Sequence, residues 1–342
     1  MTLKLRHQGY SIRSGTRRKT LKGYKLSLMS SPRPLKRLAV GLFLSGYLGS
    51  LGCNRDTKPE VADSLKTTAP AANVTHTVLR NTGWDESAAG SFMVLSVADD
   101  PINAALVLPQ ETDSTLSKMG AFNLDDFANI AVDLIGPGGA VGKSSIAINA
   151  QQLPAEGCLV WPSVRLTVKP LQAWKVGFAA DHAAAIKMDS VEQVGAADSS
   201  SVTTELAKQA SAISSNGDPA FQGLPFIVEK AYRLSLGDTV DIVASIVRKI
   251  NEEANPREER LLLIIERTSN GGDYSVAFQT RSAGSEDVVR TNTMLAAVRF
   301  VRTNRVALVV SFEYDDGGQV ALLERVAPRS WKITWRSAYT GC

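Results

Sequence analysis

The second half of the chain consists of short apolar runs separated by turn-forming residues, and this alternation restricts the fold more than any other feature. The runs are rich in β-branched and aromatic residues, which favour strands. Residues 270–273 (NGGD) and 315–318 (DDGG) are typical of the loops of β-hairpins. Because successive runs follow one another without intervening helices, the pattern favours an antiparallel sheet. The predicted strands are 226–236, 261–267, 274–281, 294–302, 305–314, 319–326 and 331–339.

Two helices are predicted in the same half. Residues 202–214 lie between Ser- and Gly-rich segments and fit a helix. Asp238 fits a helix N-cap, and the apolar residues after it recur at helical spacing. Pro256 prevents a simple continuation of this helix, so we interpret the acidic residues around it as a solvated helix end. The apolar residues are Val240, Val243, Val247 and Ile250, and the acidic ones are Glu252, Glu253, Glu258 and Glu259.

The first half combines strand-like runs with one further helix signal. Residues 92–97 and 104–109 are typical of two strands that flank a turn at 99–101. Asn123 is placed to cap a helix that begins at Leu124. Further strand-like runs are 146–150, 158–161, 164–168 and 174–179, and the predicted helix has Phe127, Ile130 and Leu134 on one face.

These elements predict an α+β fold with two strand-rich domains. The chain of 342 residues is long enough for two hydrophobic cores. A change of composition over residues 195–220 marks the boundary between an N-terminal α+β domain (76–200) and a C-terminal α+β domain (201–342). We expect the second domain to be a mostly antiparallel sheet with one or two packed helices.

The net charge of +4 is an average over two unlike parts of the chain. Residues 1–52 contain eleven Lys or Arg and no Asp or Glu, which leaves 27 basic against 34 acidic residues from Cys53 onward. A nucleic-acid-binding domain would be basic. Nucleic acid is therefore not expected as a partner.

An export signal precedes the predicted domains. Residues 33–37 (RPLKR) are basic, and residues 38–52 form an uncharged apolar run that ends in small residues before Cys53. A membrane-spanning helix needs about 20 apolar residues, so this run suits a cleavable signal better. The arrangement resembles the bacterial lipoprotein signal, in which a cysteine after a small residue receives a diacylglyceryl group before cleavage. The resemblance implies lipidation of Cys53, a membrane as partner and a location in the bacterial cell envelope.

The resemblance departs from the family pattern at one position, and other interpretations stay open. The family prefers Leu at the third position before the cysteine, where this chain has Ser50. An uncleaved signal anchor or an ordinary buried Cys53 also fits the apolar run. Met29 would start a signal of conventional length, so residues 1–28 are either an over-extended start or a basic arm. Residues 53–75 are polar, with Pro, Ala and Thr, and are expected to form a flexible tether.

Two cysteines remain if Cys53 carries lipid. Cys158 and Cys342 would then form an even pair in an oxidising compartment, which permits a disulfide. Such a bond would join the last residue to the first half of the chain. In the chain-entropy model a loop of this length stabilises a protein by about 4–5 kcal/mol before strain is subtracted. Two unpaired thiols are the alternative.

One glycine-rich segment imitates a nucleotide-binding motif. In GPGGAVGKSS (136–145), Pro137 stands where a phosphate-binding loop needs its first glycine. The residues that follow alternate like a strand, whereas the motif requires a helix whose N-terminus faces phosphate. We therefore interpret the segment as a hairpin loop.

Histidines and acidic pairs do not form a recognisable site either. His7, His76 and His182 are isolated from one another, and the chain has no GxSxG segment. The acidic pairs at 125–126 and 315–316 lack the spacing of a calcium loop. The sequence therefore predicts no catalytic residue, metal site or cofactor.

These observations favour a non-catalytic envelope protein, either structural or binding a protein or small molecule, over an enzyme. A secreted hydrolase with two carboxylates far apart in the sequence is one alternative. A pocket that holds two close acids with shifted pKa values would favour it. A small-molecule carrier is the other alternative, and an apolar cavity of roughly several hundred Å³ would favour that function.

Overall fold

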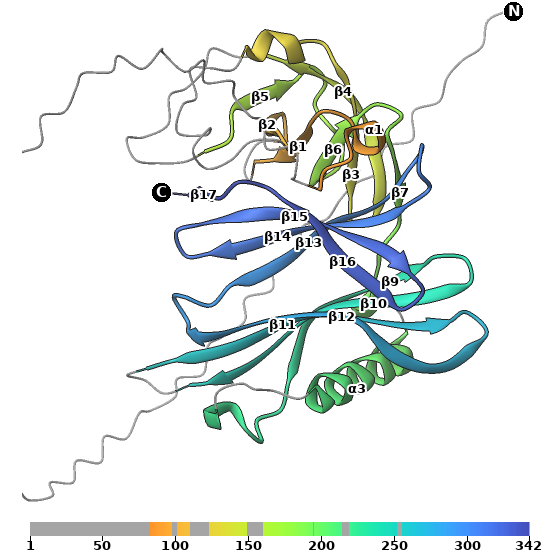
Figure 1. Cartoon of the computed structure of the whole chain (residues 1–342), viewed down its shortest axis with the longest axis vertical. Coiled ribbons are helices and arrows are strands. Elements are labelled where there is room, and N and C mark those ends of the chain that lie inside the picture. Colours follow the sequence, from red (N-terminus) through yellow and green to blue (C-terminus); the bar gives the residue numbers. More distant parts are fainter. Residues whose placement is uncertain are drawn as a thin grey trace, which may run out of the picture. The chain divides into compact units, whose positions relative to one another are not determined.

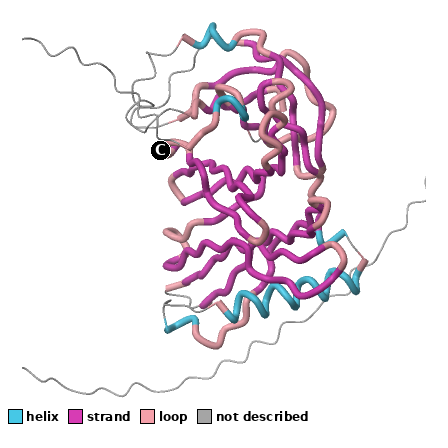
Figure 2. Tube along the Cα trace, turned by 45° about the vertical axis from the view of Figure 1, so that its right-hand side comes forward, coloured by secondary structure: helices cyan, strands magenta, loops and turns pink. Residues whose placement is uncertain are grey.

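Strands dominate the part of the chain that the structure describes (Figure 2). This computed structural model describes residues 83–97, 101–109, 123–148, 160–193, 195–213, 219–251 and 255–341. The strands form a closed barrel, a five-stranded sheet and a six-stranded sheet, all antiparallel. The strand-rich, antiparallel part of the predicted fold class is confirmed, but the protein is mostly β and not α+β. No helix within the described ranges is both long and apolar enough to cross a bilayer.

The barrel is formed by the strands that come first in the chain (Figure 1). It closes because β6 pairs with β1 on one side and with β3 on the other. Gly177 of β6 allows this, since an added Cβ there would lie 2.8 Å from Val94 Cγ2 and 3.1 Å from Leu134 Cδ2. The barrel strands are β1 (Met93–Ser96), β2 (Asn103–Val107), β3 (Ala131–Gly136), β4 (Gly139–Ala147), β5 (Ser163–Leu166) and β6 (Val176–Ala179), and helix α1 spans Glu86–Ala89.

The two sheets pack face to face through one apolar core, and we call this pair the sandwich (Figure 1). Val243 and Leu262 of the five-stranded sheet belong to the same buried cluster as Leu308 and Leu323 of the six-stranded sheet. The five-stranded sheet contains β8 (Asp189–Ser190), β9 (Ile227–Ser235), β10 (Thr239–Ile250), β11 (Arg257–Thr268) and β12 (Gly271–Ser285). The six-stranded sheet contains β7 (Ala183–Ile186), β13 (Thr291–Phe300), β14 (Val306–Tyr314), β15 (Gly317–Ala327), β16 (Ser330–Arg336) and β17 (Thr340–Gly341).

Both sheets are also covered on their outer faces. Helix α3 (Ala196–Ala212) buries Val202, Leu206 and Ala210 against the five-stranded sheet, which confirms the predicted helix in this region. The barrel covers the six-stranded sheet, where Phe178 of β6 and Phe300 of β13 meet edge to face at 6.0 Å between ring centres. Burial on two faces explains why these strands are apolar at nearly every position.

The helix predicted over residues 240–250 is wrong, because this segment is strand β10. Its side chains point alternately to two apolar layers: Ile242, Ala244 and Ile246 face α3, and Val243 faces the six-stranded sheet. Apolar residues on both faces remove the alternation that identifies a half-exposed strand. The remaining spacing of apolar residues imitates a helix.

The interpretation of Glu258 and Glu259 as a solvated helix end is also wrong. Both lie in β11, with exposed fractions of 4% and 1%. Because neighbouring residues of a strand point to opposite faces, one carboxylate enters each side of the five-stranded sheet. Each is ion-paired there, as described below.

The helix predicted to begin at Leu124 is a single 3₁₀ turn, η2 (Leu124–Phe127). Asn123 caps it as predicted, and its side chain accepts a hydrogen bond from the Asp125 backbone N–H. Asn129 takes up a positive φ of 64°, which ends the turn before β3 begins. Leu134, expected on the helix, therefore lies in β3.

The structure shows no division at residue 200. Strands β7 and β8 precede this position but pair with β13 and β9, which follow it. The described residues group as one compact unit. The division into two domains stays a prediction.

Candidate functional site

A hollow of about 260 Å³ opens between the two sheets of the sandwich, and we call it the inter-sheet pocket. Its lining residues come from β9, β10 and β11 of one sheet and from the start of β13 of the other. Its volume is near the lower limit for a pocket that binds a small organic molecule.

Two β-bulges shape this pocket. The register between β9 and β10 shifts at Ser245, so that Glu229 is an extra residue in β9. In a regular strand Glu229 and Lys230 would point to opposite faces, but across this bulge both line the pocket. A second shift, beside Met294 in β13, lies on the opposite wall. Bulges therefore place the side chains that give the pocket its chemistry.

The floor of the pocket is apolar and its rim is polar. The floor consists of four residues that belong to the buried core of the sandwich: Tyr232, Val243, Leu262 and Met294. Hydroxyl and amide groups line the rim from two strands, and they can donate or accept hydrogen bonds. These polar residues are Ser245, Thr291, Asn292 and Thr293.

An ion-pair network surrounds Arg260 at the pocket wall. Arg260 Nη1 lies 2.7 Å from Glu229 Oε2, and its Nε lies 2.7 Å from Glu258 Oε2. Lys249 also contacts Glu258. Burial acts to raise the pKa of Glu258, but the hydrogen bond from Lys249 and the positive charge of Arg260 hold it below its ordinary value. The pocket therefore presents Glu229 and Arg260 as a neutralised pair.

Lys230 is the second cation among the lining residues, beside Arg260. Its Nζ lies 5.8 Å from the centre of the Tyr232 ring, and within the described residues it makes no ion pair with a carboxylate. The pocket lining contains Lys230, Arg260 and Glu229 as its charged residues. Its net charge is therefore positive, which favours an anionic group.

Two close carboxylates lie elsewhere in the sandwich, away from the pocket lining. Asp241 of β10 is directly opposite Glu266 of β11, and the exposed fraction of Asp241 is 0%. Burial, followed by the negative charge of Glu266, raises the pKa of Asp241 to about 8. No donor of the described residues reaches either Asp241 oxygen, which agrees with an uncharged, protonated Asp241 beside an ionised Glu266.

Glu266 is the ionised member of this pair. Arg325 donates to it through Nη2 at 2.8 Å and Nε at 3.2 Å, and the Arg329 backbone N–H donates at 3.1 Å. Burial acts to raise the pKa of Glu266, but the Arg325 hydrogen bonds lower it overall. Both acids are enclosed in the core with their partners, so they are not arranged to meet a substrate.

A third charged cluster lies on the face of the five-stranded sheet that α3 covers. Arg248 of β10 is ion-paired with Glu259, which Arg281 Nε also contacts at 2.7 Å. The Arg248 guanidinium lies 4.6 Å from the centre of the Phe226 ring and 5.7 Å from that of Phe221. This cluster is buried and fixes strand ends to the segment that follows α3.

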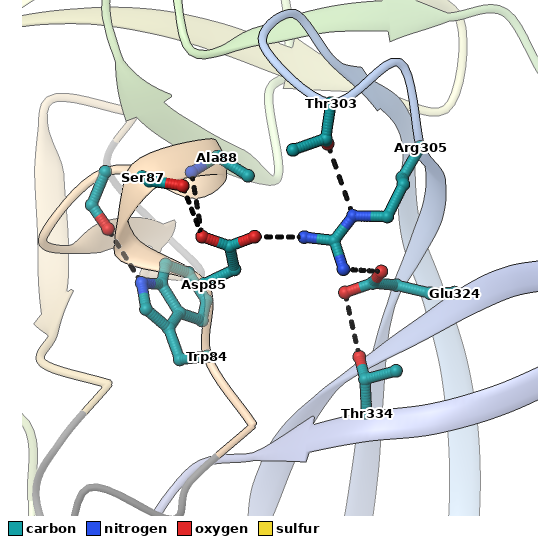
Figure 3. Close-up of polar contacts among 9 residues, drawn as sticks. Trp84, Asp85, Ser87, Ala88, Thr303, Arg305, Glu324 and Thr334 are labelled. Carbon is teal, nitrogen blue, oxygen red and sulfur yellow. Dashed lines mark hydrogen bonds and ion pairs between the residues drawn. The ribbon is translucent and has the colours of Figure 1, made fainter.

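The polar network in Figure 3 joins α1 to the six-stranded sheet. Arg305 Nη2 lies 2.6 Å from Asp85 Oδ2, and its Nη1 lies 2.9 Å from the buried Glu324, to which Thr334 also donates. The hydrogen bond from Ser87 and the charge of Arg305 hold the pKa of Asp85 below its ordinary value against the effect of burial. Every charge in this network has a partner, so we assign it to stability.

The structure places the remaining sequence motifs in structural positions. The turn of the β3–β4 hairpin lies within 136–145, as predicted, but residues 139–145 already belong to β4. Lys143 lies in β4 with its Nζ 3.3 Å from Asp133. His182 Nδ1 is within 3.1 Å of the Ala180 carbonyl. Asp316 accepts a hydrogen bond from Tyr339, which raises the pKa of that phenol to about 12.

The cysteines singled out in the sequence, Cys53, Cys158 and Cys342, lie outside the described residues, as do the export signal and the tether. Within the described ranges, no group of three or more His, Cys, Asp or Glu side chains is placed to hold a metal ion. No protein-family model, curated protein or solved structure matches the chain.

Sequence reasoning did not find the inter-sheet pocket. One signal was present: Thr291, Asn292 and Thr293 are polar residues directly before an apolar strand, and Ser245 interrupts an apolar one. Neither segment marks a cavity by itself, because the bulges that open it depend on pairing between strands.

Proposed function

We propose that the chain is a lipid-anchored envelope protein that binds a small amphiphilic anion in the inter-sheet pocket. The observation that carries this proposal is the combination of an apolar floor with a rim cation, Lys230, that has no carboxylate partner among the described residues. Pockets of this kind bind the apolar part of a ligand by burial and orient it through a few polar groups.

The pocket supports binding better than hydrolysis. Glu229 is the one carboxylate among its lining residues, and Arg260 already neutralises it. A glycosidase mechanism needs two carboxyl groups that face the substrate, whereas Asp241 and Glu266 are enclosed in the core. The charge and shape of the pocket therefore favour a carrier or sensor of small molecules.

Two variants test the ligand assignment by calorimetry with octanoate and with the neutral octanol as probes. Lys230→Met is expected to weaken octanoate binding roughly tenfold or more, since a charged hydrogen bond contributes about 1.5–3 kcal/mol, and to leave octanol binding unchanged. Ser245→Phe, which puts a ring into the hollow, is expected to abolish binding of both probes.

Lys332→Met, at an exposed lysine of β16, is the matched control and should bind octanoate as the unmodified chain does. Unfolding curves of all variants show whether the fold is retained. If the folded Ser245→Phe variant binds octanoate normally, the ligand is not in the inter-sheet pocket.

The lipid anchor and the disulfide are tested together by the intact mass of protein purified from membranes. We expect cleavage before Cys53, an added diacylglyceryl group, and a mass lower by two hydrogens than that of the reduced form. Residues that neighbour the two cysteines in the sequence support the disulfide. Val160 and Trp161, which follow Cys158, line the same apolar hollow as Thr340 and Gly341, which precede Cys342. An unprocessed, non-acylated mass would contradict the anchor, and an unchanged mass after reduction would contradict the disulfide.

A further inference from the structure

In the connection between β5 and β6 (167–175), the loop formed by residues 167–173 presents two apolar side chains to solvent. Leu171 has an exposed fraction of 101% and Val168 one of 58%. Single exposed apolar residues are common on protein surfaces. Here, Val168 and Leu171 lie three positions apart on the same loop, at one end of the barrel.

This loop is fixed at both ends. The Val168 backbone N–H donates to Ser144 Oγ at 3.1 Å, and Ser144 is itself buried. At the other end, Trp174 is buried in the barrel, and its Nε1 donates to the Pro101 carbonyl at 2.8 Å. Pro170 further restricts the backbone between them. The contacts at both ends of the loop therefore hold Leu171 in an exposed position.

Basic residues lie close to the two apolar residues in the sequence. Arg165, Lys169 and Lys175 are all exposed, and residues 157–180 contain no Asp or Glu. This local excess of positive charge contrasts with the chain from Cys53 onward, in which acidic residues outnumber basic ones. The loop therefore differs from the rest of that part of the chain in both charge and polarity.

We propose that the 167–173 loop inserts Leu171 and Val168 into the interfacial region of an anionic lipid bilayer. Apolar tips that enter the acyl boundary, with lysine and arginine at the headgroups, match the chemistry of such a surface. A protein partner would need a larger contact area than two side chains offer. This inference rests on the proposed location at a membrane and is independent of the ligand pocket.

Hydrogen exchange of the full chain tests the proposal, because it reads out the loop itself and not the N-terminal apolar run. Vesicles of phosphatidylglycerol and phosphatidylcholine are expected to slow exchange in a peptide that covers residues 167–175. Leu171→Asp should require roughly tenfold more anionic lipid for the same protection, as the burial energy of one leucine predicts. Val288→Asp, at a residue with an exposed fraction of 60%, is the matched control and should leave the loop's protection unchanged.

Three results would overturn the inference. The first is equal exchange in the loop with and without anionic vesicles. The second is equal protection by vesicles of phosphatidylcholine alone, which would remove the role of the three cations. The third is protection that rises with protein concentration in the absence of lipid, which would make a second copy of the chain the partner. Octanoate binding is measured separately, so failure of this inference and failure of the ligand assignment are distinguishable.

Discussion

Replacing Arg248 by Met is expected to lower the free energy of unfolding by about 3 kcal/mol. Glu259 is almost completely buried, and removing one partner of a buried ion pair costs about 3–5 kcal/mol because the other charge stays in the core. The lower end of that range applies here, since Arg281 still contacts Glu259 at 2.7 Å. Urea denaturation measures the change, provided that the slope with urea concentration stays the same.

The double variant Arg248→Met, Glu259→Gln separates charge from packing. If the loss comes from an uncompensated carboxylate, the double variant should regain much of the stability. A double variant as unstable as the single one would assign the loss to the lost contacts with Phe221 and Phe226. Arg302→Met, at an exposed arginine, should change stability little.

Replacing Asp241 by Asn is expected to make the protein less sensitive to alkaline pH. The pKa of Asp241 is raised from 3.8 to about 8 in the folded protein, so the folded state holds a proton that the unfolded state releases. The associated stability is fully present below about pH 4 and is lost as pH rises toward 8. Asn resembles the protonated acid, so the variant should match the unmodified chain near pH 4. At pH 9 it should be more stable by several kcal/mol, at roughly 1.4 kcal/mol for each pKa unit.

Unfolding free energies at pH 5, 7 and 9 test this expectation. In that range Glu266, whose pKa is below its ordinary value, stays ionised and adds no slope of its own. Asp273→Asn, at an exposed residue of β12, is the control and should keep the pH dependence of the unmodified chain. The same slope in the Asp241→Asn variant would show that Asp241 is ionised in the folded protein throughout.

Local patterns predicted most of the strands of the sandwich. The hairpins at 270–273 and 315–318 could be placed because Gly and Asp determine their turns: the first joins β11 to β12, and the second joins β14 to β15. The helix over 202–214 was predicted from the Ser- and Gly-rich segments at its two ends, and the structure adds that Val202, Leu206 and Ala210 form its buried face. These signals depend on residues that are close in the sequence.

The errors share one physical cause: they depend on what packs against a segment from elsewhere in the chain. β10 resembles a helix because α3 and the six-stranded sheet bury its two faces. Glu258 and Glu259 resemble solvated residues until Arg248, Arg260 and their neighbours are placed beside them. The inter-sheet pocket depends on the extra residue, Glu229, whose position is defined only by the register of β9 against β10.

The short segment that contains β7 and β8 connects the two sheets of the sandwich, because it pairs with one strand in each of them. It borders β13 in one sheet and β9 in the other, so Ala183 pairs with Phe300 although more than a hundred residues separate them in the sequence. Contacts so distant in the chain are slow to form. During synthesis this segment emerges before either partner strand. Until both partner strands are made, it carries unpaired strand edges, which can pair with other chains. Assembly of this protein therefore favours a folding environment in which those edges are protected until the C-terminal strands are complete.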